Sequence, residues 1–276
     1  MIKQAIIPLA GQGTRLLPLT SVFAKELLPI NGKPGVEYII EECIQAGIKE
    51  IIFIISKKKE IIKKYFYNDK YYKNIIKKKK DKRLLKEYKK ILKYKKKIKF
   101  VYQNKPLGTG DAVLKTKKLI KDKYFLMLLP DDLIVKKNCS KDMISVHKRY
   151  KCSVMASMKI NKKTVKRWGI YSIKSIINKN NFFINDVVEK PGIKSAPSNN
   201  AVIGRYILPK KIFKKLITQK KGKGGEIHIT DSIQSLILEN NKFIGHNFTG
   251  KYLDCGTMNG YIKSALEISK LWKSAL

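Results

Sequence analysis

Acidic residues and arginine are both scarce in this 276-residue chain. The sequence holds 21 Asp and Glu against 60 Lys and Arg, which gives a formal net charge of +39. Only five of the basic residues are Arg: Arg15, Arg83, Arg149, Arg167 and Arg205. Arg is the residue that usually reads bases and clamps phosphates, whereas here Lys is spread along the chain beside many Ile and Asn, as biased codon usage would produce. We therefore expect no specific nucleic-acid partner, although the charge should attract polyanions in a salt-dependent way.

Cysteine and long apolar runs are limited as well. The four cysteines have no CxxC spacing, which argues against a zinc site and against a disulfide framework: Cys43, Cys139, Cys152 and Cys255. No run reaches the roughly 18 apolar residues of a membrane span. The N-terminal stretch has no long apolar core ending in a small-residue cleavage site, so we expect no signal peptide. Free thiols, a cytoplasmic location and no membrane partner are the expectations.

Apolar runs alternate with helical patterns in the first half of the chain. Strands are predicted at 4–10, 50–56, 98–103 and 124–135, with helices at 35–47 and 110–120 between them. This alternation predicts an α/β fold: a Rossmann-like, doubly wound, mostly parallel mixed sheet, with strands covered on both faces.

The second half has shorter predicted elements. Strands are predicted at 153–160, 169–173, 184–190 and 201–209, a helix near 230–240, and an amphipathic helix at 260–276. No Pro/Gly/Ser-rich linker separates the halves, so we expect a single domain spanning 1–276.

The segment 57–97 is strongly Lys-rich. Leu84, Leu85, Tyr88, Ile91 and Leu92 fall close to helical spacing. We favour a solvated helical insertion. A helix that binds nucleic acid or a membrane surface is the alternative.

The stretch LAGQGTRLLPLT (9–20) follows the first predicted strand. A strand that ends in a glycine-bearing turn can aim backbone amides at phosphate. However, Leu16 stands where the dinucleotide fingerprint needs its third glycine, and no Gly-Lys-Ser/Thr triplet of a P-loop follows. From this stretch alone, a plain tight turn is an equally good interpretation.

Carboxylates follow the fourth predicted strand. Asp131 and Asp132 lie in LPDD, and ligands of parallel sheets bind beyond the carboxyl ends of the strands. Such carboxylates commonly hold Mg²⁺ together with substrate phosphates, although a Pro-Asp-Asp turn is the plain alternative. Asp254 in YLDCGT is a candidate second metal ligand, or else a turn or cap residue.

The sequence offers a candidate contact for a nucleotide base but no pattern typical of a covalent nucleophile. Gln103 ends the third strand and Gly108 follows, and a carboxamide beside bare backbone offers the donors and acceptors that a base edge needs. No Ser-His-Asp or Cys-His spacing suggests a covalent nucleophile, and the three histidines are isolated.

Eight motifs occur in a recognisable order: AGQGTRLLPLT, AKELLPINGKP, QNKPLGTGDAV, LPDD, VVEKP, NNAVIGRYIL, GEIHITDSI and YLDCGT. In this order and spacing they resemble the sugar nucleotidyltransferase family, and closely its bacterial UTP–glucose-1-phosphate uridylyltransferases (UDP-glucose pyrophosphorylases). The resemblance runs from about Lys3 to the last helix. It implies a nucleotide-binding half at 1–135, a sugar-binding half at 136–259, and homo-oligomers, dimeric or tetrameric.

The resemblance also implies a role for each candidate residue. Those near the nucleotide would be Ala10, Gly11, Gly13, Thr14, Arg15, Gln103 and Gly108. Those near the sugar and its phosphate would be Asp132, Gly169, Glu189, Lys190 and Val202. Asp131 and Asp254 would hold Mg²⁺, and the catalytic residues would be Arg15, Lys25, Asp131 and Lys190.

The reaction implied by the resemblance joins two anions. The phosphate oxygen of glucose 1-phosphate attacks the α-phosphorus of UTP in line, and pyrophosphate leaves. Mg²⁺, Arg15, Lys25 and Lys190 would neutralise the repulsion, and an already ionised nucleophile needs no general base. The alternatives are a thymidylyl or broad-specificity transferase and, more remotely, a non-catalytic polyanion-binding protein.

Overall fold

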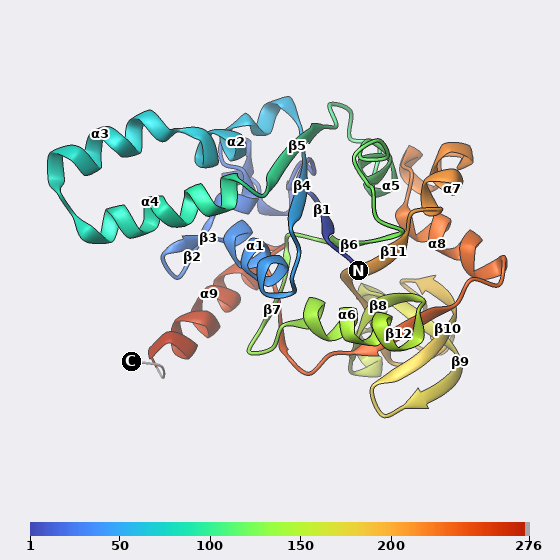
Figure 1. The fold of residues 1–276 in the computed structure, drawn as a ribbon. Coiled ribbons are helices and arrows are strands. Elements are labelled where there is room, and N and C mark those ends of the chain that lie inside the picture. Colours follow the sequence, from blue (N-terminus) through green and yellow to red (C-terminus); the bar gives the residue numbers. More distant parts are fainter. Residues whose placement is uncertain (274–276) are drawn as a thin grey trace.

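A nine-stranded mixed sheet forms the centre of the computed structural model, with helices on both sides (Figure 1). The structure describes residues 1–273 (for Asp69, Lys223, Trp272 and Lys273, the backbone alone). The strand order is β5-β4-β1-β6-β11-β8-β12-β10-β9. The strands are β1 (Gln4–Pro8), β4 (Glu50–Ile55), β5 (Ile98–Tyr102), β6 (Tyr124–Leu128), β8 (Ser153–Lys159), β9 (Gly169–Asn178), β10 (Asn181–Glu189), β11 (Asn200–Pro209) and β12 (Phe243–Asn247).

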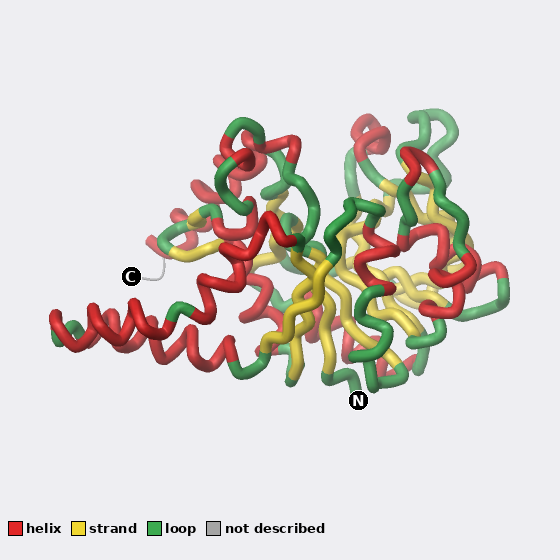
Figure 2. The backbone as a smooth tube through the Cα atoms, turned by 90° about the horizontal axis from the view of Figure 1, so that it is seen from above, coloured by secondary structure: helices red, strands yellow, loops and turns green. Residues whose placement is uncertain are grey.

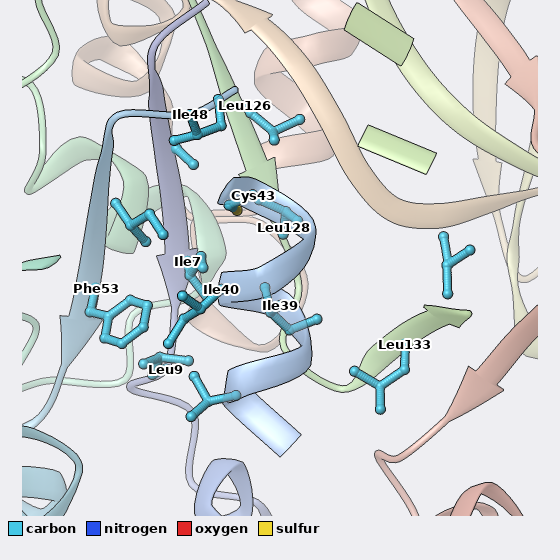
Figure 3. Packing of buried hydrophobic residues seen from close by; sticks show 14 of the residues in the cluster. Ile7, Leu9, Ile39, Ile40, Cys43, Ile48, Phe53, Leu126, Leu128 and Leu133 are labelled. Atoms are coloured by element: carbon cyan, nitrogen blue, oxygen red, sulfur yellow. The ribbon is translucent and has the colours of Figure 1, made fainter. Parts of the chain in front are cut away.

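Strands β5, β4, β1 and β6 are parallel, and β1, β4 and β6 are almost fully buried, whereas the edge strand β5 is partly exposed. Alternate residues of β1 join different cores: Ile7 packs with helix α1 (Gly35–Gln45) and Ile6 packs with helix α5 (Thr109–Leu114). Figure 3 shows Ile40 of α1 directed at Ile7 and Leu9. The predicted doubly wound architecture is therefore confirmed, and it explains the near-continuous apolar strands.

Parallel pairing gives way to mixed pairing beyond β6. Strand β11 runs antiparallel to both β6 and β8, and β12 runs parallel to β8. Strand β9 pairs with β10 and also returns to β11 through Ile170 and Ala201, so that five strands close on themselves. The sheet is continuous across the two halves of the chain.

Two predicted elements differ from the structure. The strand expected at 124–135 is interrupted: β6 ends at Leu128, and β7 (Asp132–Val135) pairs with β13 (Lys251–Asp254) in a separate two-stranded sheet. Pro130 has no N–H to continue the ladder, so the chain turns between the strands. Helix α5 ends at Leu114, not at residue 120. Strand β12 was not predicted.

The Lys-rich segment 57–97 forms three helices, α2 (Glu60–Tyr67), α3 (Asp69–Lys79) and α4 (Lys82–Lys95). Helices α3 and α4 are antiparallel neighbours that project from the body of the molecule as an arm (Figures 1 and 2). Lys80 makes the reversal with a φ of 50°, and Asp81 caps α4 by accepting from the amides of Arg83 and Leu84. The rings of Tyr72 and Tyr88 stack between the two helices.

The remaining elements complete the covering layers: β2 (Pro29–Ile30), β3 (Lys33–Pro34), α6 (Cys139–Tyr150), α7 (Ile212–Thr218), α8 (Ile229–Leu238) and α9 (Met258–Lys273). The C-terminal helix expected at 260–276 corresponds to α9, with 274–276 outside the described residues. Among the described residues, no helix has the length and apolar character to span a membrane.

Candidate active site

A cleft of about 450 Å³ opens at the carboxyl ends of β1, β5 and β6. Nine of the sequence-predicted residues line it: Ala10, Gly11, Gly13, Thr14, Arg15, Lys25, Gln103, Gly108 and Asp131. The lining also includes residues that sequence reasoning missed, among them Gln12, Pro106, Thr109 and Glu226. Parallel strands that end at one sheet edge account for this convergence of loops far apart in the sequence.

The glycine loop after β1 is held in a compact shape. Gly13 adopts a φ of 70°, and a Cβ placed on it would lie 3.0 Å from the Thr20 methyl carbon. The Thr20 hydroxyl donates to the Gly13 carbonyl at 2.8 Å. A left-handed residue packed this tightly favours glycine.

The opposite wall of the cleft is built from the loop after β5. The Gln103 amide donates to the Gly108 carbonyl at 3.0 Å and to the Asp111 carboxylate at 2.8 Å, which orients the carboxamide. Gly108 has a φ of 96°, and a Cβ there would lie 2.6 Å from the Ile227 carbonyl. Ile227 exchanges backbone hydrogen bonds with Leu107 and Gly110. The segment before α8 therefore holds this wall in place.

Two cations converge on Asp131. The Lys25 ammonium donates to Asp131 Oδ2 at 2.8 Å, and Arg15 Nη2 lies 3.5 Å from the same oxygen. Burial by itself raises the pKa of Asp131, but the charge and hydrogen bond of Lys25 outweigh it and hold the pKa below its ordinary value. Burial alone would lower the pKa of Lys25, but Asp131 and Glu26 raise it above its ordinary value. Lys25 and Asp131 are therefore both charged near neutral pH.

Asp131 and Asp254 face a common space beside Gly256. A Cβ placed on Gly256 would lie 2.8 Å from Asp131 Oδ2, 3.2 Å from Asp254 Oδ1 and 3.1 Å from Arg15 Nη2. Two carboxylates around one small space suit Mg²⁺, which typically takes one or two carboxylates and completes its shell with water and substrate phosphates. Among the described residues, no group of three or more His, Cys, Asp or Glu could hold a metal by itself. The donor set therefore fits a metal that binds together with phosphate.

Asp132 is held from behind the cleft. Its carboxylate accepts from the Gly204 amide at 2.8 Å and from the Tyr252 hydroxyl at 2.7 Å. Burial, and then the neighbouring charge of Asp131, raise the pKa of Asp132. Asp132 thus ties the turn after β6 to β11 and β13.

The residues expected near the sugar gather at the start of β9 and the end of β10. A Cβ on Gly169 would lie 3.1 Å from Glu189 Oε2 and 3.4 Å from a Val202 methyl carbon. Lys190 has a φ of 47°, its amide donates to the Trp168 carbonyl at 2.9 Å, and its side chain is 64% exposed. None of these four predicted residues, Gly169, Glu189, Lys190 and Val202, lines the cleft described above.

Trp168 and its neighbour connect this group to the carboxylates. The Trp168 ring meets the Tyr252 ring edge-on at 5.5 Å, and the Tyr252 hydroxyl holds Asp132. Arg167 Nη2 lies 4.0 Å from Asp254 Oδ2. The sugar-side group and the metal-side group are therefore joined through 167–168.

Two buried ion pairs beside the cleft were not predicted. Lys59 donates to both oxygens of Glu26 and to the Leu9 carbonyl at 2.8 Å, which ties the segment of Lys25 to the end of β1. Burial lowers the pKa of Lys59, partly offset by Glu26. The second pair joins Arg205 of β11 to Glu42 of α1. A charge inside the apolar run AVIGRYILP was the available signal for Arg205; Lys59, within a lysine run, gave none.

Comparison with known proteins identifies the family to which this chain belongs. The sequence matches the Nucleotidyl transferase family over residues 4–270. A protein of Methanocaldococcus jannaschii is 38% identical over 268 residues, which cover 97% of this chain and 93% of that protein. The UTP–glucose-1-phosphate uridylyltransferase of Pseudomonas aeruginosa is 34% identical, covering 96% of this chain and 95% of its own. A crystal structure of UDP-glucose pyrophosphorylase complexed with UDP-glucose superposes with a TM-score of 0.86 at 34% identity, covering 98% of this chain and 99% of that one. The chain belongs to the nucleotidyl transferase family.

Proposed function

We propose that this protein transfers the uridylyl group of UTP to α-D-glucose 1-phosphate, giving UDP-glucose and pyrophosphate. The observation that carries the proposal is the meeting of Arg15, Lys25 and Asp131 beside the glycine loop, at the edge of a 450 Å³ cleft. The names of the relatives specify the two substrates.

UTP occupies the cleft in this proposal. Gln103 and Gly108 contact the uracil, with Ala10 and Gly11 near the base. Gly13, Thr14 and Arg15 bind the phosphates, because they line the cleft and a glycine-bearing loop can offer backbone amides to an anion. Thr109 and Glu226 are additional wall residues.

Glucose 1-phosphate binds toward the second half of the chain. Gly169, Glu189 and Val202 contact the sugar, because the missing side chain at Gly169 leaves room between the other two. Lys190 binds the sugar phosphate, as an exposed cation next to this group. Asp132 supports this side of the site through Tyr252, whose ring packs on Trp168.

Asp131 and Asp254 are the residues that would hold Mg²⁺, because they face one space beside Gly256. When bound with substrate, the metal neutralises phosphate charge. Lys25 is buried next to Asp131 and can contact the phosphate that links nucleotide and sugar.

The chemistry of the site is positioning and charge neutralisation. An oxygen of the sugar phosphate bonds to the α-phosphorus as the bond to the bridging oxygen of pyrophosphate breaks. Arg15, Lys25 and Lys190 stabilise the negative charge on both sides of this exchange. The nucleophile is ionised at neutral pH, so no side chain has to remove a proton.

Cytoplasmic location and homo-oligomerisation, as a dimer or tetramer, are parts of the same proposal. The four cysteines are free thiols, which supports a reducing compartment. Light scattering of the purified protein measures the oligomeric state.

Pyrophosphate release by the purified protein tests the proposal. UTP and dTTP are compared in the presence of Mg²⁺, each with and without glucose 1-phosphate. Release that requires UTP and the sugar phosphate is the expected result. Equal rates with dTTP would favour a broad-specificity transferase, and no release from folded protein would contradict the proposal.

A further inference from the structure

The guanidinium of Arg205 occupies the space behind the turn that carries Asp131. Arg205 lies in β11 opposite Leu128, and it is fully buried. Nε donates to the Glu42 carboxylate at 3.1 Å, and Nη2 donates to Glu42 at 2.9 Å and to the Asp132 carbonyl at 2.6 Å. Nη1 donates to the carbonyls of Leu129 at 3.1 Å and Gly204 at 3.2 Å. All five N–H donors of the side chain are therefore used.

These contacts hold the turn from both ends. The carbonyls of Leu129 and Asp132 flank Pro130 and Asp131, and the same guanidinium binds both. Gly204 adds two bonds: its carbonyl accepts from the Leu129 amide and its amide donates to the Asp132 carboxylate, each at 2.8 Å. A Cβ on Gly204 would lie 2.4 Å from Asp132 Oδ2. The backbone on either side of Asp131 has little freedom to move.

Glu42 fixes the guanidinium in turn. It lies in α1 and is itself buried, and its carboxylate also accepts from the hydroxyl of Ser140 at 2.5 Å and from the Ser140 amide at 3.2 Å, at the start of α6. Two helices and one strand thus meet behind a turn that has no regular structure of its own. Apolar side chains of similar volume would often stabilise the fold as well as this ion pair does, because the desolvation of two buried charges offsets much of their attraction.

From this arrangement we infer that Arg205, anchored by Glu42, is a positioning residue: it fixes the turn 129–132 so that Asp131 is aimed at the cleft. The inference rests on the proposed function, since it concerns how that site presents its carboxylate. Lysine cannot replace Arg205, because a single ammonium has three donors at one point and cannot span both carbonyls.

The test compares Arg205→Lys with wild type through UTP binding by calorimetry, with Mg²⁺ and with EDTA. The Kd for UTP in EDTA divided by the Kd in Mg²⁺ measures how much the metal at Asp131 strengthens binding. This measurement requires no turnover. Groups that orient metal ligands typically change metal affinity or activity about 10–100-fold, so we expect the ratio to fall about tenfold and kcat by a similar factor. KM for glucose 1-phosphate should change little.

Phe243→Leu is the matched control, since Phe243 is a buried β12 residue outside the cleft. It should lower Tm yet keep the wild-type ratio. If Arg205→Lys does not fold, Glu42→Gln replaces it, because the amide keeps the shape of the anchor and removes its charge; a smaller fall in the ratio is then expected.

The results separate the two proposals. A wild-type ratio and wild-type kcat in Arg205→Lys, or in Glu42→Gln where it replaces that variant, with only Tm lowered, would overturn the positioning role and leave a stabilising ion pair. A wild-type protein that binds no UTP would instead overturn the proposed function.

Discussion

Asp131 is balanced by cations before any substrate binds, and this determines what the residue can do. Lys25 and Arg15 both contact one of its oxygens, while Asp254 faces the same space from β13. Because the pKa of Asp131 lies below its ordinary value of 3.8, the carboxylate stays ionised at any pH above that value. We therefore expect kcat to show no ionisation of Asp131 between about pH 6 and 8. The carboxylate acts by charge and geometry.

Replacing Asp131 with Asn should abolish most turnover while leaving the fold intact. The amide is nearly isosteric, but it loses the charge that would hold Mg²⁺ and pair with Lys25. Loss of one electrostatic group of this kind lowers kcat about 10²–10³-fold. Turnover in Mg²⁺ and circular dichroism are the measurements. Asp142→Asn in α6 carries the same charge change outside the cleft, so its activity should match wild type. Full activity in Asp131→Asn would remove Asp131 from the proposed metal site.

At the level of elements, the loop after β5 and the segment before α8 form one wall. Ile227 receives a hydrogen bond from the Gly110 amide at 2.7 Å and donates one to the Leu107 carbonyl at 2.8 Å. Gly108 lies between these contacts, where a side chain would meet the Ile227 backbone. This wall of the cleft therefore depends on two segments more than a hundred residues apart.

Gly108→Ala should weaken UTP binding through this wall. The new methyl group would lie 2.6 Å from the Ile227 carbonyl and 2.9 Å from its amide nitrogen, so the two segments must separate. We expect KM for UTP to rise about tenfold, in keeping with the loss of positioning by displaced backbone. Steady-state kinetics with varied UTP provides the measurement.

Gly47→Ala is a control matched in the sign of φ. Gly47 has a φ of 87° and no atom within 4 Å of an added Cβ. Both variants place alanine at a positive φ, which costs about 1 kcal/mol. Gly108 has in addition a ψ of 174°, in a region essentially restricted to glycine, and only Gly108→Ala adds the steric contact. If the two variants have the same KM for UTP, the wall at Gly108 has no role in nucleotide binding.

Sequence patterns predicted elements well where local chemistry decides them. The apolar runs of β1, β4 and β5 and the 3.6-residue spacing of α1 are visible in the chain itself. The break between β6 and β7 was missed because apolar residues lie on both sides of Pro130, Asp131 and Asp132, and because the turn is stabilised by Arg205, more than seventy residues away. In the Lys-rich segment the helical spacing was visible, but neither the cap at Asp81 nor the packing of the helices on one another was predicted.

Among the site residues, too, those placed by local chain order could be predicted, whereas those placed by long-range contacts could not. Gly13, Asp131 and Gln103 follow strands, so their place at the sheet edge could be predicted from the chain order. The pairs Arg205–Glu42 and Lys59–Glu26 could not, because a buried ion pair joins residues that no spacing rule connects. These pairs support the loops beside the cleft, and Glu26 itself lines it.

Across the whole molecule, positive charge is densest in the arm. Residues 69–97 contain 15 Lys and Arg against three Asp and Glu, within a chain of 276 residues whose net charge is +39. The base of the arm packs on α1: Lys90 pairs with Glu37 at 2.9 Å, and the Tyr94 hydroxyl donates to Glu41 at 2.9 Å. Beyond Tyr72 and Tyr88 the two helices extend away from the body (Figure 2).

Replacing 73–87 with a short Gly-Ser linker should leave catalysis nearly unchanged. The rings of Tyr72 and Tyr88 stack with centroids 5.6 Å apart, so a short linker can join their backbones without moving the base of the arm. The exchange removes eight basic and two acidic residues. We expect kcat/KM within about twofold of wild type, because charges beyond one Debye length of the cleft are largely screened.

Retention on heparin gives this variant a second measurement. Polyanion binding that depends on many lysines falls steeply with salt, in proportion to the number of contacts made. The shortened protein should therefore elute at lower salt than wild type, with a shallower salt dependence. A variant with the wild-type fold but strongly reduced turnover would instead show that the distal arm contributes to the active site. Unchanged elution would mean that polyanions bind the body, where the remaining lysines are spread.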